Sequence, residues 1–113
     1  MNKVILEGFV GKDPEIRNLP NGTMVCSASL STSNNYKKDG QWVKQPPSWH
    51  RLVAFGKFAE ALAECRKRQR AKVEGKLVYS EWTDSEGIKR VTVEICVFSV
   101  STNGKTDPGA AGS

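Results

Sequence analysis

Histidine is almost absent from this 113-residue sequence, and its scarcity excludes several kinds of active site. His50 is the only histidine, so neither a catalytic histidine pair nor a metal site built from several histidines can form. Cys65 with His50 is a conceivable pair of nucleophile and base, but no third orienting group and no oxyanion motif can be named. We therefore expect no enzymatic activity.

Cysteine is also scarce. Cys26, Cys65 and Cys96 are the only three, and they lie dozens of residues apart within apolar patterns. Zinc sites use closely spaced cysteine pairs, and disulfide frameworks of secreted proteins use an even number of cysteines. We expect reduced, packed thiols, no metal and no cofactor.

The sequence has no apolar run long enough to cross a bilayer and no secretory leader. It also has no excess of acidic charge, because 17 Lys and Arg stand against 12 Asp and Glu, giving a net charge of +5 and a pI near 9.3. We expect a soluble, cytoplasmic protein that does not contact a membrane. Its basic charge favours a polyanionic partner, without choosing between DNA, RNA and anionic lipid.

Apolar and polar residues alternate with the period of a β-strand in five segments, and one segment has helical spacing. The predicted strands are Lys3 to Val10, Thr23 to Thr32, Ser48 to Phe55, Lys72 to Trp82 and Ile88 to Val100, and the predicted helix is Lys57 to Arg68. This order predicts an all-β fold with one short helix: a five-stranded OB-fold barrel with the helix between strands three and four. We expect one domain over residues 1–100, a polar hairpin loop over residues 33–47, and a disordered tail over residues 101–113.

Aromatic residues are spread among basic, strand-forming residues instead of forming one apolar run. In the third predicted strand, period-two alternation places Trp49, Arg51 and Phe55 on one face and Leu52 and Ala54 on the other. Exposed rings beside cations suit the stacking of unpaired bases next to a phosphate-binding groove. The competing interpretation is an ordinary core pair, but Leu52 and Ala54 already supply an inward face.

Several motifs in the same order resemble the bacterial-type single-stranded DNA-binding protein family, over about residues 1–100. The matching segments are Met1-Asn2-Lys3-Val4-Ile5-Leu6, Gly11-Lys12-Asp13-Pro14-Glu15, Pro20-Asn21-Gly22, Trp49-His50-Arg51, Phe55-Gly56-Lys57, Ala59-Glu60, Glu74-Gly75-Lys76-Leu77 and Trp82. The resemblance implies an OB fold, sequence-independent binding of single-stranded DNA, and assembly as a homotetramer.

The resemblance also assigns roles to individual residues. It implies base stacking by Trp49, Phe55, Trp82 and Tyr36, the last standing where the family usually has tryptophan, and a subunit contact for His50. For Tyr36 and Trp42, packing over the barrel is an equally open interpretation. The candidates for phosphate contacts, taken as a set, are Lys37, Lys38, Lys44, Arg51, Lys57, Lys72 and Lys76.

The sequence departs from the family pattern in three places. Val78, Ser80 and Glu81 replace residues that are commonly basic beside the fourth-strand tryptophan. The segment from Cys65 to Ala71 lacks the usual glycine after the helix, so this connection must close differently, and it gathers four basic residues near the helix C-terminus. The acidic protein-recruiting tip is absent, which favours a shortened or tail-less member from a bacterium, phage, plasmid or integrated element.

Three other functions stay open at this point. One is a dimeric OB interaction module of primosomal type, and another is an RNA-binding OB protein of cold-shock type. The third is a small enzyme acting on nucleic acid through His50, Cys65 or a carboxylate. We expect a binding protein that protects single-stranded DNA during replication, recombination, repair or DNA transfer.

Overall fold

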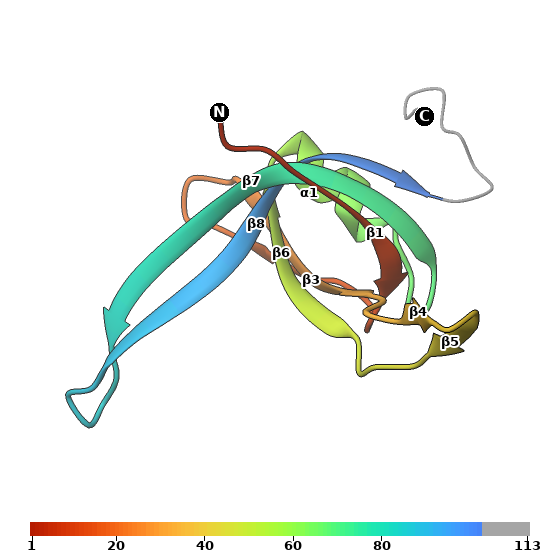
Figure 1. Cartoon of the computed structure of the whole chain (residues 1–113). Coiled ribbons are helices and arrows are strands. Elements are labelled where there is room, and N and C mark those ends of the chain that lie inside the picture. Colours follow the sequence, from red (N-terminus) through yellow and green to blue (C-terminus); the bar gives the residue numbers. More distant parts are fainter. Residues whose placement is uncertain (103–113) are drawn as a thin grey trace.

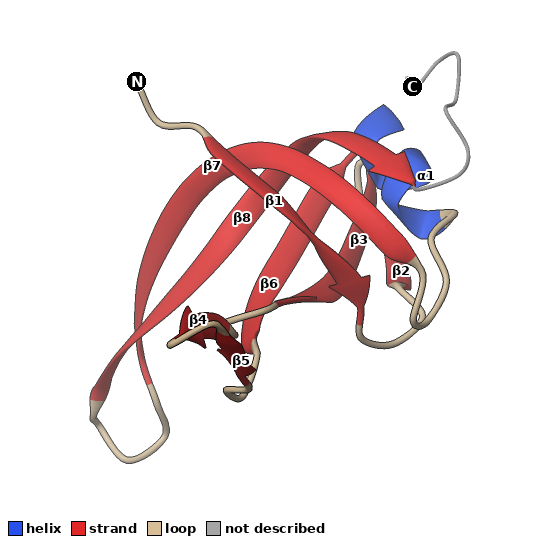
Figure 2. Cartoon of the chain, turned by 45° about the vertical axis from the view of Figure 1, so that its right-hand side comes forward, coloured by secondary structure: helices blue, strands red, loops and turns tan. Residues whose placement is uncertain are grey.

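Five strands form a closed barrel, as the sequence predicts. The computed structural model describes residues 1–102. The barrel strands are β1 (Val4–Val10), β3 (Met24–Thr32), β6 (Ser48–Phe55), β7 (Arg70–Thr83) and β8 (Lys89–Thr102). They follow the order β1-β7-β8-β6-β3, and pairing between β1 and β3 closes the ring (Figures 1 and 2). This is the arrangement of an OB fold.

Three shorter strands extend this frame. Strand β2 (Glu15–Asn18) pairs with β3 at its outer edge, whereas β4 (Tyr36–Lys38) and β5 (Gln41–Val43) form a separate hairpin between β3 and β6 (Figure 1). The hairpin turns at Asp39 and Gly40, whose φ angles are both positive, 51° and 80°. This is the backbone that a tight two-residue turn requires. The expected hairpin loop is thus confirmed, whereas β2, exposed at every position, was not predicted.

The pair β7–β8 is much longer than the barrel needs, and its far end projects as an arm (Figure 1). Asp84 closes the arm: its carboxylate accepts hydrogen bonds from the backbone N–H groups of Glu86 and Ile88 and from the guanidinium of Arg90. The Ile88 N–H, followed by Arg90, lowers the pKa of Asp84 because both favour the charged carboxylate. The turn therefore has a fixed shape at neutral pH.

A bulge between Glu74 and Gly75 lets β7 serve both as a barrel strand and as one side of the arm. At this point the backbone of Gly75 lies so close to β8 that a Cβ would be 2.3 Å from the carbonyl oxygen of Cys96. Only glycine fits without displacing the neighbouring backbone. A bulge increases the local twist and bends the strand, which turns β7 out of the barrel.

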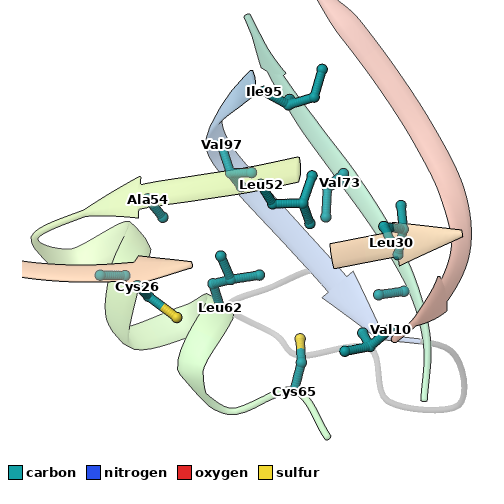
Figure 3. Packing of buried hydrophobic residues seen from close by; sticks show 12 residues of the cluster. Val10, Cys26, Leu30, Leu52, Ala54, Leu62, Cys65, Val73, Ile95 and Val97 are labelled. Carbon is teal, nitrogen blue, oxygen red and sulfur yellow. The ribbon is translucent and has the colours of Figure 1, made fainter. Parts of the chain in front are cut away.

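The barrel interior is filled by small and medium-sized apolar side chains (Figure 3). The cluster consists of Val10, Cys26, Leu30, Leu52, Ala54, Ala59, Leu62, Cys65, Ala71, Val73, Ile95 and Val97. Figure 3 shows that Leu62 and Cys65 reach into this cluster from the helical side. The helix region therefore covers one end of the barrel and contributes to its core.

The helix α1 (Lys57–Ala63) is shorter than predicted, since the sequence favoured Lys57 to Arg68. The backbone turns after Ala63 so that Cys65 can enter the core, and the guanidinium of Arg66 donates to the carbonyl oxygens of Ala63 and Cys65, both at 2.9 Å. In place of the missing glycine, Arg68 takes a positive φ of 70°. The four basic residues thus follow the helix instead of forming its last turn.

The last strand is longer than predicted. β8 continues to Thr102, and Ser101 and Thr102 pair with Lys72 and Ala71 of β7. The prediction that the tail begins at residue 101 was therefore wrong by two residues, because the register with β7 continues. Residues 103–113, on which the rest of the tail prediction falls, lie outside the described part.

The three thiols differ in burial: Cys26 and Cys65 are buried, whereas Cys96 is partly exposed. Burial raises the pKa of the Cys65 thiol to about 11, with further contributions from Cys26 and Glu64. In the folded protein, iodoacetamide should modify the partly exposed Cys96 well before Cys65, as peptide mass spectrometry would measure. Because the folded thiol keeps its proton when the unfolded one loses it near 9, the free energy of unfolding should also fall between about pH 9 and 11. Equal labelling of both thiols in native protein would contradict this assignment.

Candidate nucleic-acid interface

The central strand β6 presents aromatic rings to solvent. Trp49 is 60% exposed and Phe55 is 44% exposed, whereas Leu52 and Ala54 are fully buried. The predicted alternation is therefore confirmed, and the interpretation of Trp49 and Phe55 as a core pair is wrong. The interior is already filled, so the rings remain available to a ligand.

This exposed surface continues across both neighbours of β6. On one side Ser29 of β3 lies opposite Arg51. On the other side, Nε of Arg51 pairs with the Glu94 carboxylate of β8 at 2.9 Å. Farther along, the indole N–H of Trp82 in β7 donates to the hydroxyl oxygen of Thr92 in β8 at 2.8 Å. This contact fixes the Trp82 ring, 50% exposed, toward β8.

We call this surface the outer face. Its members come from four adjacent strands and share an outward position: Ser27, Ser29, Trp49, Arg51, Val53, Phe55, Trp82, Thr92 and Glu94. It combines three rings, a guanidinium and several hydroxyls on a gently curved sheet. Such a surface can hold flat apolar groups and anions.

A hollow of about 230 Å³ opens on the outer face beside β2 and the preceding loop. Its lining includes the cations Lys12 and Arg51, the hydroxyls of Ser27 and Ser29, and the carboxylates of Asp13 and Glu15. Arg51 also lines an adjoining hollow of about 520 Å³. The two cations and two carboxylates of the first hollow balance in charge, so binding strength must come from the rings as well as from cations.

Gly11 determines how the Trp49 ring lies. A Cβ at Gly11 would be 2.6 Å from Cζ3 of Trp49 and 2.5 Å from Oγ of Ser29. The ring thus packs with its edge against the backbone of the loop after β1. This support restrains the indole without covering its exposed surface.

The hairpin β4–β5 carries Tyr36, Lys37, Lys38 and Trp42, all exposed. Lys37 lies opposite Trp42 and Tyr36 opposite Val43, so the two rings project from opposite faces of the hairpin. The base of the hairpin is held to β6, because the amide of Asn34 donates to the Ser48 hydroxyl at 2.8 Å. Packing over the barrel is therefore not the role of Trp42, which is 70% exposed.

The remaining predicted cations are spread more widely. Lys76 of β7 lies opposite Cys96 of β8. It comes six residues before Trp82, on the same side of the strand. Lys72 is ten residues before Trp82, about 33 Å along the strand, and faces Glu7 of β1. Lys57 begins α1 and places its ammonium 5.5 Å from the centre of the Phe58 ring. The structure therefore gathers Lys76 with the outer face and leaves Lys72 apart from it. Lys57 follows Phe55 by two residues and turns its ammonium toward the Phe58 ring.

His50 points away from Trp49, as predicted, and has a partner within the chain. Its Nε2 lies 2.8 Å from the hydroxyl oxygen of Thr32 on β3. The subunit contact implied by the resemblance stays a prediction.

Phe9 is one of the exposed rings that sequence reasoning missed, with Tyr79 and Phe98. It is 51% exposed, whereas its neighbours Gly8 and Val10 are buried. It pairs with Ser31, which in turn pairs with Trp49. Period-two alternation around Phe9 was a usable signal, but the branched residues of this strand resemble a core strand.

Residues 1–102 contain no group of three or more His, Cys, Asp and Glu side chains placed to hold a metal ion. Within the same range, no helix has the length and apolarity needed to cross a membrane.

Comparison with known proteins agrees with this geometry. The sequence model of the single-strand binding protein (SSB) family matches residues 1–102. Among solved structures, the chain is similar to the Plasmodium falciparum SSB in its complex with ssDNA, with 28% sequence identity and a TM-score of 0.75 over 85% of each chain.

The contact between Gly11 and Trp49 predicts a local effect of substitution. Gly11→Ala should displace the Trp49 ring, because the added methyl group would occupy its edge, while the barrel stays folded. Aromatic ¹³C–¹H NMR spectra would detect this as a shift of the Trp49 resonances. Trp42 and Trp82 serve as internal controls, and an unchanged Trp49 signal would exclude the restraint.

Proposed function

Because the chain belongs to the single-strand binding protein family, we propose that it binds single-stranded DNA across the outer face, without sequence preference. The observation that carries this proposal is the exposure of Trp49, Phe55 and Trp82 on adjacent strands around a filled barrel. Members of this family bind DNA and catalyse no reaction, which agrees with the absence of an evident catalytic constellation in the sequence.

Base stacking accounts for the lack of sequence preference. Every base has a π-face, so a ring accepts any of them, and each stack contributes about 1–3 kcal/mol. Bases within a duplex are already stacked and paired, so they cannot reach rings on a flat surface unless the duplex opens. The outer face therefore favours unpaired strands and keeps them unpaired.

Cations around the rings hold the backbone. Arg51 lies among the rings, Lys76 borders them, and Lys37 and Lys38 extend from the hairpin without ion pairs among the described residues. Tyr36 on the same hairpin is a further stacking candidate. Lys72 lies away from this cluster, so any phosphate it contacts belongs to a more distant part of the strand. Lys57 follows Phe55 by two residues, so a phosphate that it contacts lies near that ring.

We further propose that the protein works in the cytoplasm as a homotetramer, protecting single-stranded DNA during replication, recombination, repair or DNA transfer. SSB proteins typically form oligomers, which supports self-association. A dimeric primosomal-type module and an RNA-binding OB protein remain the two alternatives. The 2′-hydroxyl is the group that would distinguish RNA from DNA at these stacking sites.

Removing a ring should weaken DNA binding without unfolding the barrel. We expect Trp49→Ala and Phe55→Ala each to lower the affinity for oligo-dT about 5- to 150-fold, the equivalent of one lost stack. Fluorescence anisotropy would measure the affinity, and thermal melting followed by circular dichroism would verify folding. Phe58→Ala is the matched control, because Phe58 is an exposed ring on α1 outside the outer face. Equal affinities for all three variants and the wild type would refute the assigned surface.

Phosphate contacts should make binding sensitive to salt. The logarithm of the association constant should fall linearly with the logarithm of salt concentration, with a slope of about −0.7 per phosphate contact on a single strand. The double variant Lys37→Ala/Lys38→Ala should make the slope shallower by up to about 1.4 if both residues contact phosphate. A titration with oligo-dT at several salt concentrations, repeated with duplex DNA and with RNA, would measure slope and preference together. Tighter binding of duplex or RNA would contradict the proposal.

A further inference from the structure

We propose that Phe9 and the hollow beside it form an additional nucleotide-binding position, which extends the path of the strand from Trp49 across β3 onto β1. This proposal rests on the function proposed above. It adds a stacking ring and a cation to the path, and it specifies that the path continues from Trp49 toward β1.

The strand register places Phe9 in line with the outer face. Phe9 of β1 lies opposite Ser31 of β3, and Ser31 lies opposite Trp49 of β6. Directly opposed residues on adjacent strands project from the same face of a sheet. Adjacent strands are about 4.8 Å apart, so the backbones of Phe9 and Trp49 are separated by roughly 10 Å. Two exposed rings thus stand on either side of a small serine.

Close packing fixes this row. Gly8 approaches β3 so closely that a Cβ would be 1.8 Å from the carbonyl oxygen of Ser31. The Ser31 hydroxyl in turn donates to the carbonyl oxygen of Phe9 at 3.3 Å. Phe9 is therefore held on an ordered junction of two strands, where a ring loses little entropy on binding a base.

A hollow of about 570 Å³ lies beside Phe9, between β1, the end of β3 and the base of the β4–β5 hairpin. Its lining combines the apolar Phe9 and Pro47 with the polar side chains of Lys44, Gln45 and Arg70. An apolar wall beside hydrogen-bonding groups suits a nucleobase, whose faces are apolar and whose edges are polar.

The charges around this hollow suit a phosphate group. Lys44 has no ion pair among the described residues, and Arg70 contacts Glu7 only loosely, with 3.5 Å between Nε and Oε2. The two cations, Lys44 and Arg70, outnumber the one carboxylate, Glu7, so the net charge around the hollow is positive. Lys44 is the better phosphate ligand, because Arg70 would first have to give up its contact with Glu7.

A second copy of the chain is the competing occupant. Ile5 is also exposed and lies on the same side of β1 as Phe9. The polar and cationic lining favours DNA over an apolar subunit contact at Phe9 itself. Ile5 therefore provides the matched control: it shares the strand and the face, but it does not line the hollow.

The test compares Phe9→Ala, Phe9→Tyr and Ile5→Ala with the wild type on oligo-dT of about 4 to 16 nucleotides, the range of site sizes of single OB folds. Short oligonucleotides that occupy only the outer face should bind the wild type and Phe9→Ala within about twofold. Above a threshold length, Phe9→Ala should bind about tenfold more weakly, the scale of one lost stack, and Phe9→Tyr should restore the affinity. Ile5→Ala should follow the wild type at every length.

Two further measurements make the outcome unambiguous. Oligonucleotides containing 5-iodouracil should photo-cross-link to the peptide that contains Phe9 only above the threshold length, and light scattering should give the same mass for Phe9→Ala and wild type. The proposal is overturned if Phe9→Ala shows no loss of affinity at any length, or if it changes the mass of the assembly instead. Failure of the wild type to bind any oligonucleotide would refute the proposed function, whereas normal short-strand binding without the length effect would refute only the Phe9 position.

Discussion

Each side chain of β6 can face either the barrel core or the solvent, but not both. The rest of the structure depends on this alternation. The strand is held between β3 and β8, so its pleat has one face toward the barrel and one face outward. Leu52 and Ala54 fill the inward positions completely. Bulky rings at Trp49 and Phe55 would not fit there, and the same alternation that builds the core therefore displays them.

Neighbouring strands extend the exposed face of β6 into a wider surface. The register with β3 supplies hydroxyls, β8 supplies Glu94 and Thr92, and the hydrogen bond to Thr92 orients Trp82. Glycines at Gly8, Gly11 and Gly75 allow the close approaches on which this arrangement depends. The barrel is thus a rigid support whose chemistry lies on its exterior, as expected for a protein that binds a long polymer and not a small molecule.

Periodic patterns in the sequence predicted the parts that depend on local alternation. The five barrel strands, the order of the helix and the two faces of β6 all follow from residues a few positions apart, and these predictions are confirmed. The predicted end of the helix at Arg68 was wrong. The packing of Cys65 into the core overrides the helical propensity of the following basic residues. The residues Ser101 and Thr102 were missed because their pairing with β7 depends on a distant strand.

The same limit applies to the candidate site. Sequence spacing placed Trp49, Arg51 and Phe55 on one face, but it could not show that Lys72 lies apart from them or that Phe9 shares a row with Trp49. Those relations arise from register between strands that are far apart in the chain. Residue type identifies which side chains can bind a nucleotide, and tertiary pairing decides which of them can act on the same one.

The contact between Arg51 and Glu94 gives the surface a particular behaviour toward its ligand. The guanidinium is already ordered by a carboxylate, so a phosphate that bound Arg51 would replace one anion with another and gain little net energy from the exchange. When the phosphate leaves, the original partner is still in place and no charge is stranded. An attachment point of this kind favours rapid exchange of whichever anion occupies it.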